Sequence, residues 1–138
     1  MTDDVLYQDR ILELAKAGRA LPRLDNPDAT ARADNPICGD RVTLDFKLEN
    51  GAIVAVGAKV QGCALCQAAA AVIAENATGK TSGEVAAAGD AVAAYLAGEG
   101  DALPWPDLAT FEPVRPMKSR RECVVLPFKA AAKAFSGA

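Results

Sequence analysis

An alternating run of apolar and polar residues, followed by a turn signal, constrains the fold of this chain most strongly. Over residues 41–49 the apolar side chains fall on every second position, which is the period of a strand with one buried face. Asn50-Gly51 follows directly, and this dipeptide favours the two-residue turn of a β-hairpin. Residues 53–56 start the return strand, with a bulge or break expected near Gly57. The sequence therefore predicts an antiparallel hairpin over about residues 41–61.

Helical patterns flank this hairpin on both sides. An N-terminal helix is predicted over residues 3–17, with Thr2 as its cap and Gly18 at its end. After the hairpin, Ser82 is a candidate cap for a second of three further helices. These three are predicted over residues 64–77, 83–97 and 119–135, the last with a proline at position 127.

Proline-rich stretches separate these elements. Residues 19–36 contain three prolines and two Asp-Asn pairs, and we predict a long surface loop there. Residues 99–118 contain four prolines and predict a second loop, with one helical turn at 106–109. The fold class expected is α+β, a small antiparallel sheet packed with an N-terminal helix and three or more C-terminal helices. A length of 138 residues suits one domain, residues 1–138.

Composition and charge exclude several classes of protein. The net charge of −3 argues against a nucleic-acid partner, since phosphate binding needs a clustered positive surface. No apolar run approaches the ~20 residues of a membrane helix. The first four residues include two aspartates and no basic residue, whereas secretory and transit signals begin with basic residues. We expect a cytoplasmic protein that binds neither nucleic acid nor membrane.

The chain has four cysteines and no histidine. The absence of histidine excludes Ser-His and Cys-His catalysis and also excludes imidazole ligands. In a chain without a leader, cysteines indicate metal binding or thiol chemistry more than structural disulfides. A metal here would have to be held by Cys, Asp or Glu side chains.

Three cysteines lie where a reactive thiol is favoured. A single free cysteine is most often a small core residue. Cys38, however, lies in a turn before a strand, Cys63 precedes a predicted helix, and Cys123 falls in the first turn of the last one. Helix N-termini favour the thiolate form, and Arg120 and Arg121 add positive charge beside Cys123.

Three motifs together are specific to one family. They are Asn-Pro-Ile-Cys-Gly-Asp at 35–40, Gly-Cys at 62–63 and Arg-Arg-Glu-Cys at 120–123. In these motifs, over about residues 5–135, the chain resembles the NifU/IscU family of iron–sulfur cluster scaffolds, and within it the SufU branch. The resemblance implies a SufU/IscU-like fold. It also implies a ligand set for a metal or cluster made of Cys38, Asp40, Cys63 and Cys123.

The ligand role of Asp40 rests on this resemblance. From the sequence alone an ordinary turn aspartate is an equal alternative, although Gly39 permits the tight turn that brings thiolate and carboxylate together. Three thiolates and one carboxylate carry four negative charges, so Zn²⁺ or a [2Fe–2S] core would leave two. Because clusters prefer thiolate ligands, a site with one oxygen ligand binds a cluster more weakly than a site with four thiolates. We therefore expect Asp40 to set how readily the cargo leaves.

The resemblance implies a role in cluster assembly. A SufS-like cysteine desulfurase would deliver persulfide sulfur, with Cys123 and Cys38 as candidate acceptors. The protein would then assemble a [2Fe–2S] cluster for apo iron–sulfur proteins or carriers. The alternatives are a zinc-dependent sulfurtransferase of the SufU kind and a structural-zinc interaction module. A scaffold or carrier is favoured over an enzyme.

Cys66 completes a C-x-x-C motif with Cys63. A thioredoxin-like motif belongs to a βαβ unit, whereas this one follows an antiparallel hairpin. SufU-like chains usually have Ser at this position. Cys66 could be a spare ligand, a resolving thiol for a persulfide, or a buried replacement for Ser, and the last is favoured.

Overall fold

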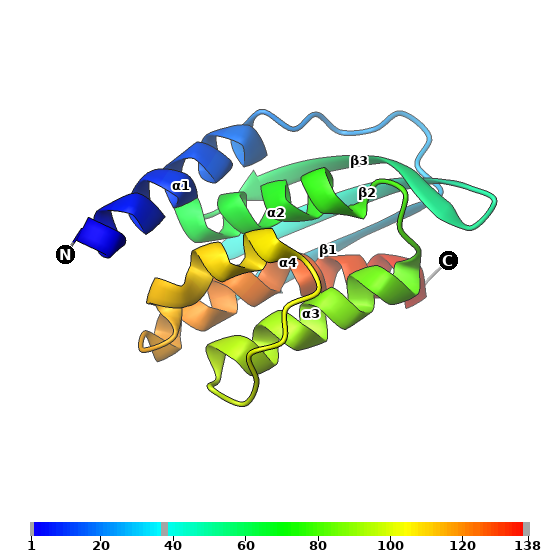
Figure 1. Ribbon diagram of the computed structural model, residues 1–138. Helices are drawn as coiled ribbons and strands as arrows, with labels where there is room; N and C mark the ends of the chain where they lie inside the picture. The colour runs from blue at the N-terminus through cyan, green and yellow to red at the C-terminus, as the bar shows by residue number, and fades with distance from the viewer. Residues whose placement is uncertain (1, 37–38, 137–138) are drawn as a thin grey trace.

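The computed structural model describes residues 2–36 and 39–136, with side chains described from Asp9 onward. Cys38, one of the predicted site residues, lies outside the described residues. The elements, in chain order (Figure 1), are α1 (Thr2–Arg19), β1 (Ala29–Asn35), β2 (Asp40–Glu49), β3 (Ala52–Gln61), α2 (Ala64–Ala77), α3 (Ser82–Leu96), the 3₁₀ helix η1 (Pro106–Val114) and α4 (Lys118–Ser136).

The predicted hairpin is confirmed. Strands β2 and β3 pair antiparallel from Arg41 opposite Gln61 to Glu49 opposite Ala52. Asn50 and Gly51 both have positive φ, 53° and 82°, which is the conformation of a type I′ turn. The alternation seen in the sequence therefore sets one face of β2 against the core, where Val42, Leu44 and Phe46 are fully buried.

The strand irregularity lies elsewhere than predicted. Strand β3 runs unbroken through Gly57, and the register shifts between Lys47 and Leu48 on the opposite strand. A Cβ at Gly57 would lie 2.6 Å from the carbonyl oxygen of Pro22, and the N–H of Ala58 donates to that same oxygen at 3.0 Å. Gly57 therefore allows the segment after α1 to approach β3 closely.

The prediction of an unbroken loop over residues 19–36 is wrong for its second half. Residues 29–35 form β1, which pairs antiparallel with β2 and completes a sheet of order β1-β2-β3. The inward positions of β1 are alanines, which are depleted in strands. The alternation of apolar and polar residues that marks a strand is therefore weak in this segment. The small side chains suit a strand that α4 covers directly.

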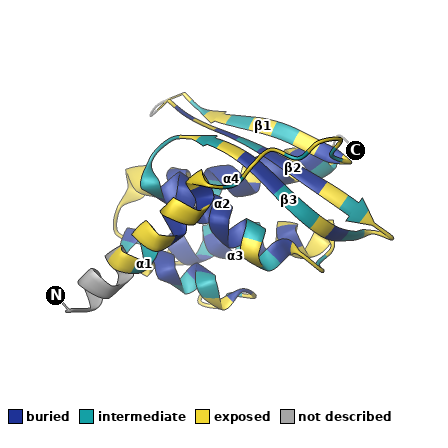
Figure 2. Ribbon diagram, turned by 90° about the horizontal axis from the view of Figure 1, so that it is seen from above, coloured by how far each residue is buried: buried dark blue, intermediate teal, exposed yellow. Residues whose placement is uncertain are grey.

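Helices cover one face of the sheet. α2 and α4 contact the strands, α1 lies against α2, and α3 packs outside on α4. α2 is buried on most of its surface (Figure 2), which agrees with its alanine-rich sequence. α1 continues through Gly18, where the prediction had it end. A Cβ at Gly18 would lie 2.0 Å from the backbone oxygen of Gln67, so this glycine lets α1 and α2 touch.

Two helix predictions need correction. The cap of α3 is Thr81 and not Ser82, since the Thr81 hydroxyl accepts from the Glu84 N–H at 3.2 Å and the Glu84 carboxylate accepts from the Thr81 N–H at 2.8 Å. η1 extends the single helical turn predicted at 106–109 to residue 114, because Leu108, Phe111 and Val114 recur every three residues and are buried together. With η1 and α4, the predicted α+β arrangement of one N-terminal helix and three or more C-terminal helices is confirmed.

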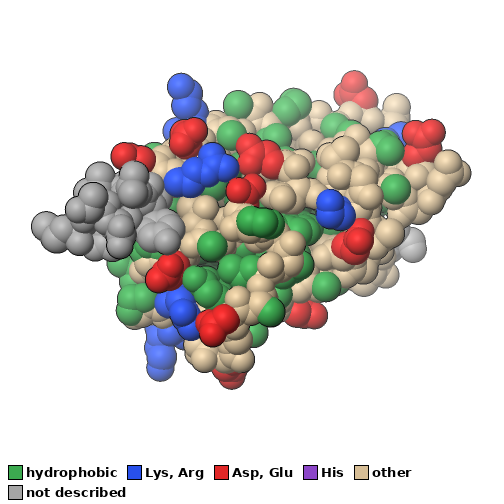
Figure 3. Space-filling view, viewed as in Figure 1, with side chains coloured by type: hydrophobic (Ala, Val, Ile, Leu, Met, Phe, Trp, Pro, Cys, Tyr) green, Lys and Arg blue, Asp and Glu red, His purple; other side chains and the backbone are tan. Residues whose placement is uncertain are grey.

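The surface agrees with the balanced composition. On the face shown in Figure 3, Lys and Arg side chains are interspersed with Asp and Glu. Within residues 2–36 and 39–136, no helix combines the length and the apolar character needed to cross a membrane.

Candidate metal centre

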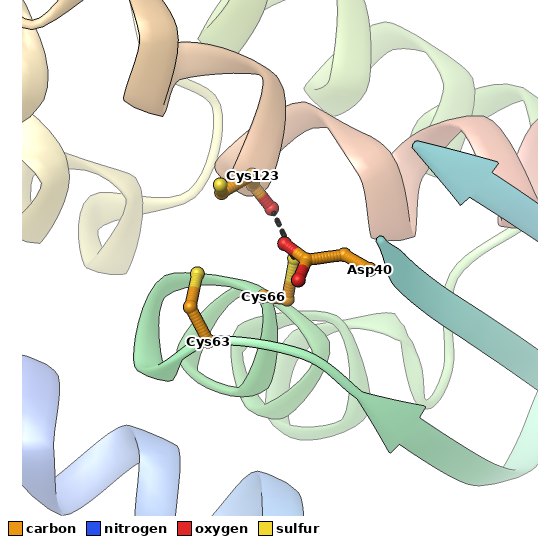
Figure 4. A group of neighbouring side chains, drawn as sticks. All are labelled: Asp40, Cys63, Cys66 and Cys123. Carbon is orange, nitrogen blue, oxygen red and sulfur yellow. Dashed lines mark hydrogen bonds between the residues drawn. The ribbon is translucent and has the colours of Figure 1, made fainter. Parts of the chain in front are cut away.

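One carboxylate and three thiols meet at one end of the sheet, where β2, α2 and α4 come together (Figure 4). The side chains are those of Asp40, Cys63, Cys66 and Cys123. Their ligand atoms all lie within 4.8 Å of one another. The centre thus brings together residues as far apart in the sequence as Asp40 and Cys123, which are separated by 83 positions.

Two glycines set the position of Asp40: Gly39, which precedes it in the chain, and Gly62, which lies close to it in space. It is the first residue of β2 and follows Gly39, whose φ of 75° few other residues adopt easily. Gly62 lies across from it, and a Cβ there would come within 2.9 Å of the Asp40 carboxylate. Asp40 is 7% exposed as a whole residue. Its burial therefore depends on the absence of a side chain at position 62.

Cys63 lies at the N-terminus of α2, as the N-cap residue in an extended conformation. The turn before it is held by Gln67, whose side-chain amide donates to the Gly62 carbonyl at 3.2 Å. Arg19, at the end of α1, donates to the Gln67 side-chain oxygen at 2.7 Å. Helix α1 thus supports the turn that presents Cys63. The thiol itself is half-buried.

Cys123 is the sixth residue of α4, in its second turn and not in the first as predicted. It is 4% exposed. The start of α4 is anchored by Arg121, whose Nε donates to the Arg115 carbonyl at 3.0 Å. The guanidinium of Arg115 lies over the ring of Tyr95, 4.6 Å from its centre. The Arg121 side chain is therefore engaged with the backbone before α4.

Cys66, in the first turn of α2, has no exposed surface. Its Sγ lies 3.1 Å from the Asp40 Oδ2 and 3.1 Å from the backbone oxygen of Cys123. The thiol is the donor, and its single proton can go to only one of its neighbouring acceptors at a time. Cys66 thus links β2 to α4 from its own place on α2.

The three thiols titrate differently. A hydrogen bond from Cys66 lowers the pKa of Cys63 to about 5 against the opposing effect of burial, with help from the N–H groups of Cys66 and Leu65. The hydrogen bond to Cys63, burial and the Asp40 carboxylate all raise the pKa of Cys66. Burial, Cys63 and Asp40 raise the pKa of Cys123. The pKa of Cys63 therefore shifts in the direction expected at a helix N-terminus, and the pKa of Cys123 shifts in the opposite direction.

The centre opens to the outside through a cavity of about 440 Å³. The lining residues share a position around the thiols, at the sheet end and the start of α4; they are Asn35, Asp40, Cys63, Ser119, Arg120, Glu122 and Cys123. A small cargo or a partner's side chain can therefore reach Cys63 and Cys123 from solvent. Arg120 is one of the lining residues and brings positive charge to this cavity.

The donor set fits a soft or borderline metal. Zinc bound by thiolates at about 2.3 Å in a tetrahedron keeps its ligand atoms about 3.8 Å apart, within the 4.8 Å spread of these side chains. A buried group of thiols and a carboxylate would hold several negative charges, which a bound cation offsets. The same thiolates are the ligands that iron–sulfur clusters prefer.

Three of the four predicted ligands come together, namely Asp40, Cys63 and Cys123. Cys38 cannot be placed because it lies outside the described residues. The sequence favours a buried Cys66 but does not predict its central position between Asp40 and Cys123. Two signals for that position are the C-x-x-C spacing and a proline four residues after Cys123.

Comparison with known proteins identifies the family. The model of the family described as NifU-like N terminal domain matches residues 6–108. The structure of a NifU-like protein (N-terminal) from Brucella abortus superimposes with a TM-score of 0.88 at 36% identity, covering 99% of this chain and 96% of that one.

Two curated relatives have named roles. The chain is 24% identical over 136 residues to the iron–sulfur cluster assembly scaffold protein IscU of Thermotoga maritima, covering 98% of this chain and 96% of that protein. It is 25% identical over 132 residues to the zinc-dependent sulfurtransferase SufU of Bacillus subtilis, covering 94% and 89%. From the family match over residues 6–108, we conclude that the chain belongs to the NifU/IscU family of iron–sulfur cluster assembly scaffolds, with SufU among its relatives.

Proposed function

We propose that this protein receives sulfur from a SufS-like cysteine desulfurase and assembles a [2Fe–2S] cluster for transfer to apo iron–sulfur proteins or carriers. The ligands proposed are Cys38, Asp40, Cys63 and Cys123. The observation that carries the proposal is the gathering of Asp40, Cys63 and Cys123 around one cavity that opens to solvent. A cargo bound there can be both loaded and removed.

The segment around Cys38 supports its inclusion. Asn35 and Asp40 line the cavity, and the N–H of Gly39 donates to the Asn35 carbonyl at 2.8 Å. Asn35 and Asp40, which flank the motif that contains Cys38, therefore lie beside the thiols.

Sulfur transfer at this site is a thiolate exchange. The thiolate of Cys38 or Cys123 attacks the outer sulfur of the desulfurase persulfide. A new S–S bond forms, the S–S bond on the desulfurase breaks, and its cysteine leaves as a thiolate. Each sulfur then needs two electrons from a reductant to become the bridging sulfide of a cluster with ferrous iron.

The test is an anaerobic absorption spectrum of metal-stripped protein given ferrous iron, cysteine, a thiol reductant and catalytic desulfurase. We expect visible sulfur-to-iron bands that are lost in Cys38→Ser and kept in Asp25→Asn, a matched change of an exposed loop residue. In Asp40→Ala the bands should form, and the rate of transfer to an apo acceptor should change. Protein that takes up sulfur without developing bands would contradict the assembly role.

A zinc-dependent sulfurtransferase is the second candidate. It is favoured by the fit of the donor atoms to tetrahedral zinc and by the name of the Bacillus subtilis relative. In this version zinc shields the thiolates until the desulfurase displaces one of them. The expected result is faster desulfurase turnover without iron, with a persulfide on Cys38 or Cys123 by mass spectrometry. Turnover that requires iron would favour the first candidate.

A further inference from the structure

The backbone of α4 is short of one donor directly at Cys123. In a helix the carbonyl of residue 123 accepts from the N–H of residue 127. Residue 127 is a proline inside α4, and proline has no N–H. The usual helical partner of the Cys123 carbonyl is therefore missing.

The thiol of Cys66 stands in for that donor. Its Sγ lies 3.1 Å from the Cys123 carbonyl oxygen, and the contact is buried, where a lost hydrogen bond costs most. The same Sγ lies 3.1 Å from the Asp40 Oδ2. One side chain of α2 thus contacts the backbone of one candidate ligand and the side chain of another, and the two oxygens compete for its single proton.

We propose that Cys66 is a positioning residue and not a metal ligand: its thiol proton replaces the N–H that Pro127 lacks, and its close contacts with Cys123 and Asp40 keep both residues in place around the centre. Cys66 is fully buried, beneath the cavity that Asp40, Cys63 and Cys123 line. The ligand role of Cys123 rests on the proposed function. The hydrogen bond to the Cys123 carbonyl does not depend on that function. An experiment can therefore contradict the positioning role of Cys66 without contradicting the proposed function, and the reverse.

Cobalt(II) distinguishes a ligand from a positioning residue, because each bound thiolate adds intensity to its charge-transfer band. Cys66→Ser keeps a donor of similar size and removes the sulfur. We expect the band of Cys66→Ser at saturation to match that of the unmodified protein. A loss equal to the share of one thiolate would show that Cys66 is a ligand and would overturn the proposal.

Cys66→Ala removes the donor. Loss of a group that orients metal ligands typically weakens metal affinity by about 10- to 100-fold, and we expect a loss in this range with the saturated band unchanged. If Cys66→Ala weakens cobalt binding no more than Cys66→Ser does, the hydrogen bond has no positioning role.

Pro127→Ala provides the decisive background, because it restores an N–H to the Cys123 carbonyl. In that background we expect Cys66→Ala to cost less cobalt affinity and less thermal stability than in the native chain. The Asp40 half of the contact stays lost, so the recovery should be partial. Equal losses in both backgrounds would overturn the proposal, and failure of cluster assembly alone would leave these measurements unaffected.

Discussion

At the scale of single residues, Gly62 decides where Asp40 can lie. A Cβ at position 62 would come within 2.9 Å of the Asp40 carboxylate, closer than unbonded atoms pack. We predict that Gly62→Ala displaces Asp40 and weakens zinc binding by about 10-fold, the lower end of the range for disturbed ligand geometry. A competition titration with a chromophoric chelator measures the loss.

Gly100→Ala is the matched control. A Cβ at Gly100 would meet no atom within 4 Å, so this variant should bind zinc like the unmodified protein. If Gly62→Ala binds zinc as tightly as Gly100→Ala, Asp40 does not hold the metal from the position seen here.

The unequal pKa values of the thiols predict unequal reactivity in the metal-free protein. Only the thiolate is alkylated readily. Because the pKa of Cys63 is lowered to about 5, its alkylation rate should stay nearly constant between about pH 6 and about pH 8. The raised pKa of Cys123 predicts a rate that still climbs over that range. Mass spectrometry after timed iodoacetamide pulses separates the two, and parallel pH profiles would contradict the assignment.

At the scale of elements, a buried carboxylate joins the loop after α1 to the sheet. Asp45 on β2 has no exposed side-chain surface. It accepts from the guanidinium of Arg23 at 2.6 Å, from the Thr30 hydroxyl at 2.7 Å and from the Leu24 N–H at 3.1 Å. It therefore fastens both the loop after α1 and strand β1 to the middle strand.

This arrangement predicts a loss of stability in acid. Burial alone would raise the pKa of Asp45, but the hydrogen bonds from Arg23, Thr30 and Leu24 outweigh it and lower the pKa. The stabilisation is thus complete above the unfolded pKa of about 3.9 and is lost as the pH falls through the lower, folded pKa. Asp45→Asn should reduce the free energy of unfolding at neutral pH by about 2 kcal/mol, a moderate figure because Arg23 is half-exposed.

Urea denaturation at several pH values checks both parts. Asp45→Asn should lose stability at neutral pH and should show a weaker acid dependence than the unmodified protein. The control is Asp25→Asn, since Asp25 is an exposed residue of the same loop. Equal acid dependence in Asp45→Asn and the unmodified protein would mean that other carboxylates cause the effect.

The elements that the sequence predicts well are those with strong local signals. The β2–β3 hairpin follows from strict alternation and Asn50-Gly51, and both are local. β1 has alanines where other strands have branched residues, and what makes it a strand is pairing with β2 and cover from α4. Such tertiary contacts leave no trace in a local pattern. The same holds for Gly18, whose role is defined by the nearby backbone of Gln67.

The residues of the candidate site that belong to recognisable motifs could be predicted from the sequence. Asp40, Cys63 and Cys123 were named from their spacing and from the family resemblance, and the structure brings them together. The part played by Cys66 depends on Pro127, which lies 61 positions further along the chain. Only the packing of α2 against α4 makes that pair meaningful.

At the scale of the whole molecule, the hydrophobic core includes side chains from every helix and strand that the structure describes. Its largest fully buried members include Phe46, Phe111 and Ile53, none of which belongs to the thiol centre. The centre lies at one end of this core, so folding and metal binding draw on largely separate contacts. This argues against a structural-zinc module, in which the metal supplies most of the folding energy.

We therefore predict that metal removal leaves the protein folded. After treatment with a strong chelator and a thiol reductant, far-ultraviolet circular dichroism at 25 °C should be unchanged and thermal unfolding should remain cooperative. Zinc should then raise the unfolding temperature through binding alone, by about 4 kcal/mol of stabilisation when free zinc is about 1,000 times the dissociation constant. Cys63→Ser, which removes a proposed ligand at the cavity, should fold equally well and lose most of that gain. Unfolding of the chelated protein at 25 °C would instead show that the metal holds the fold together.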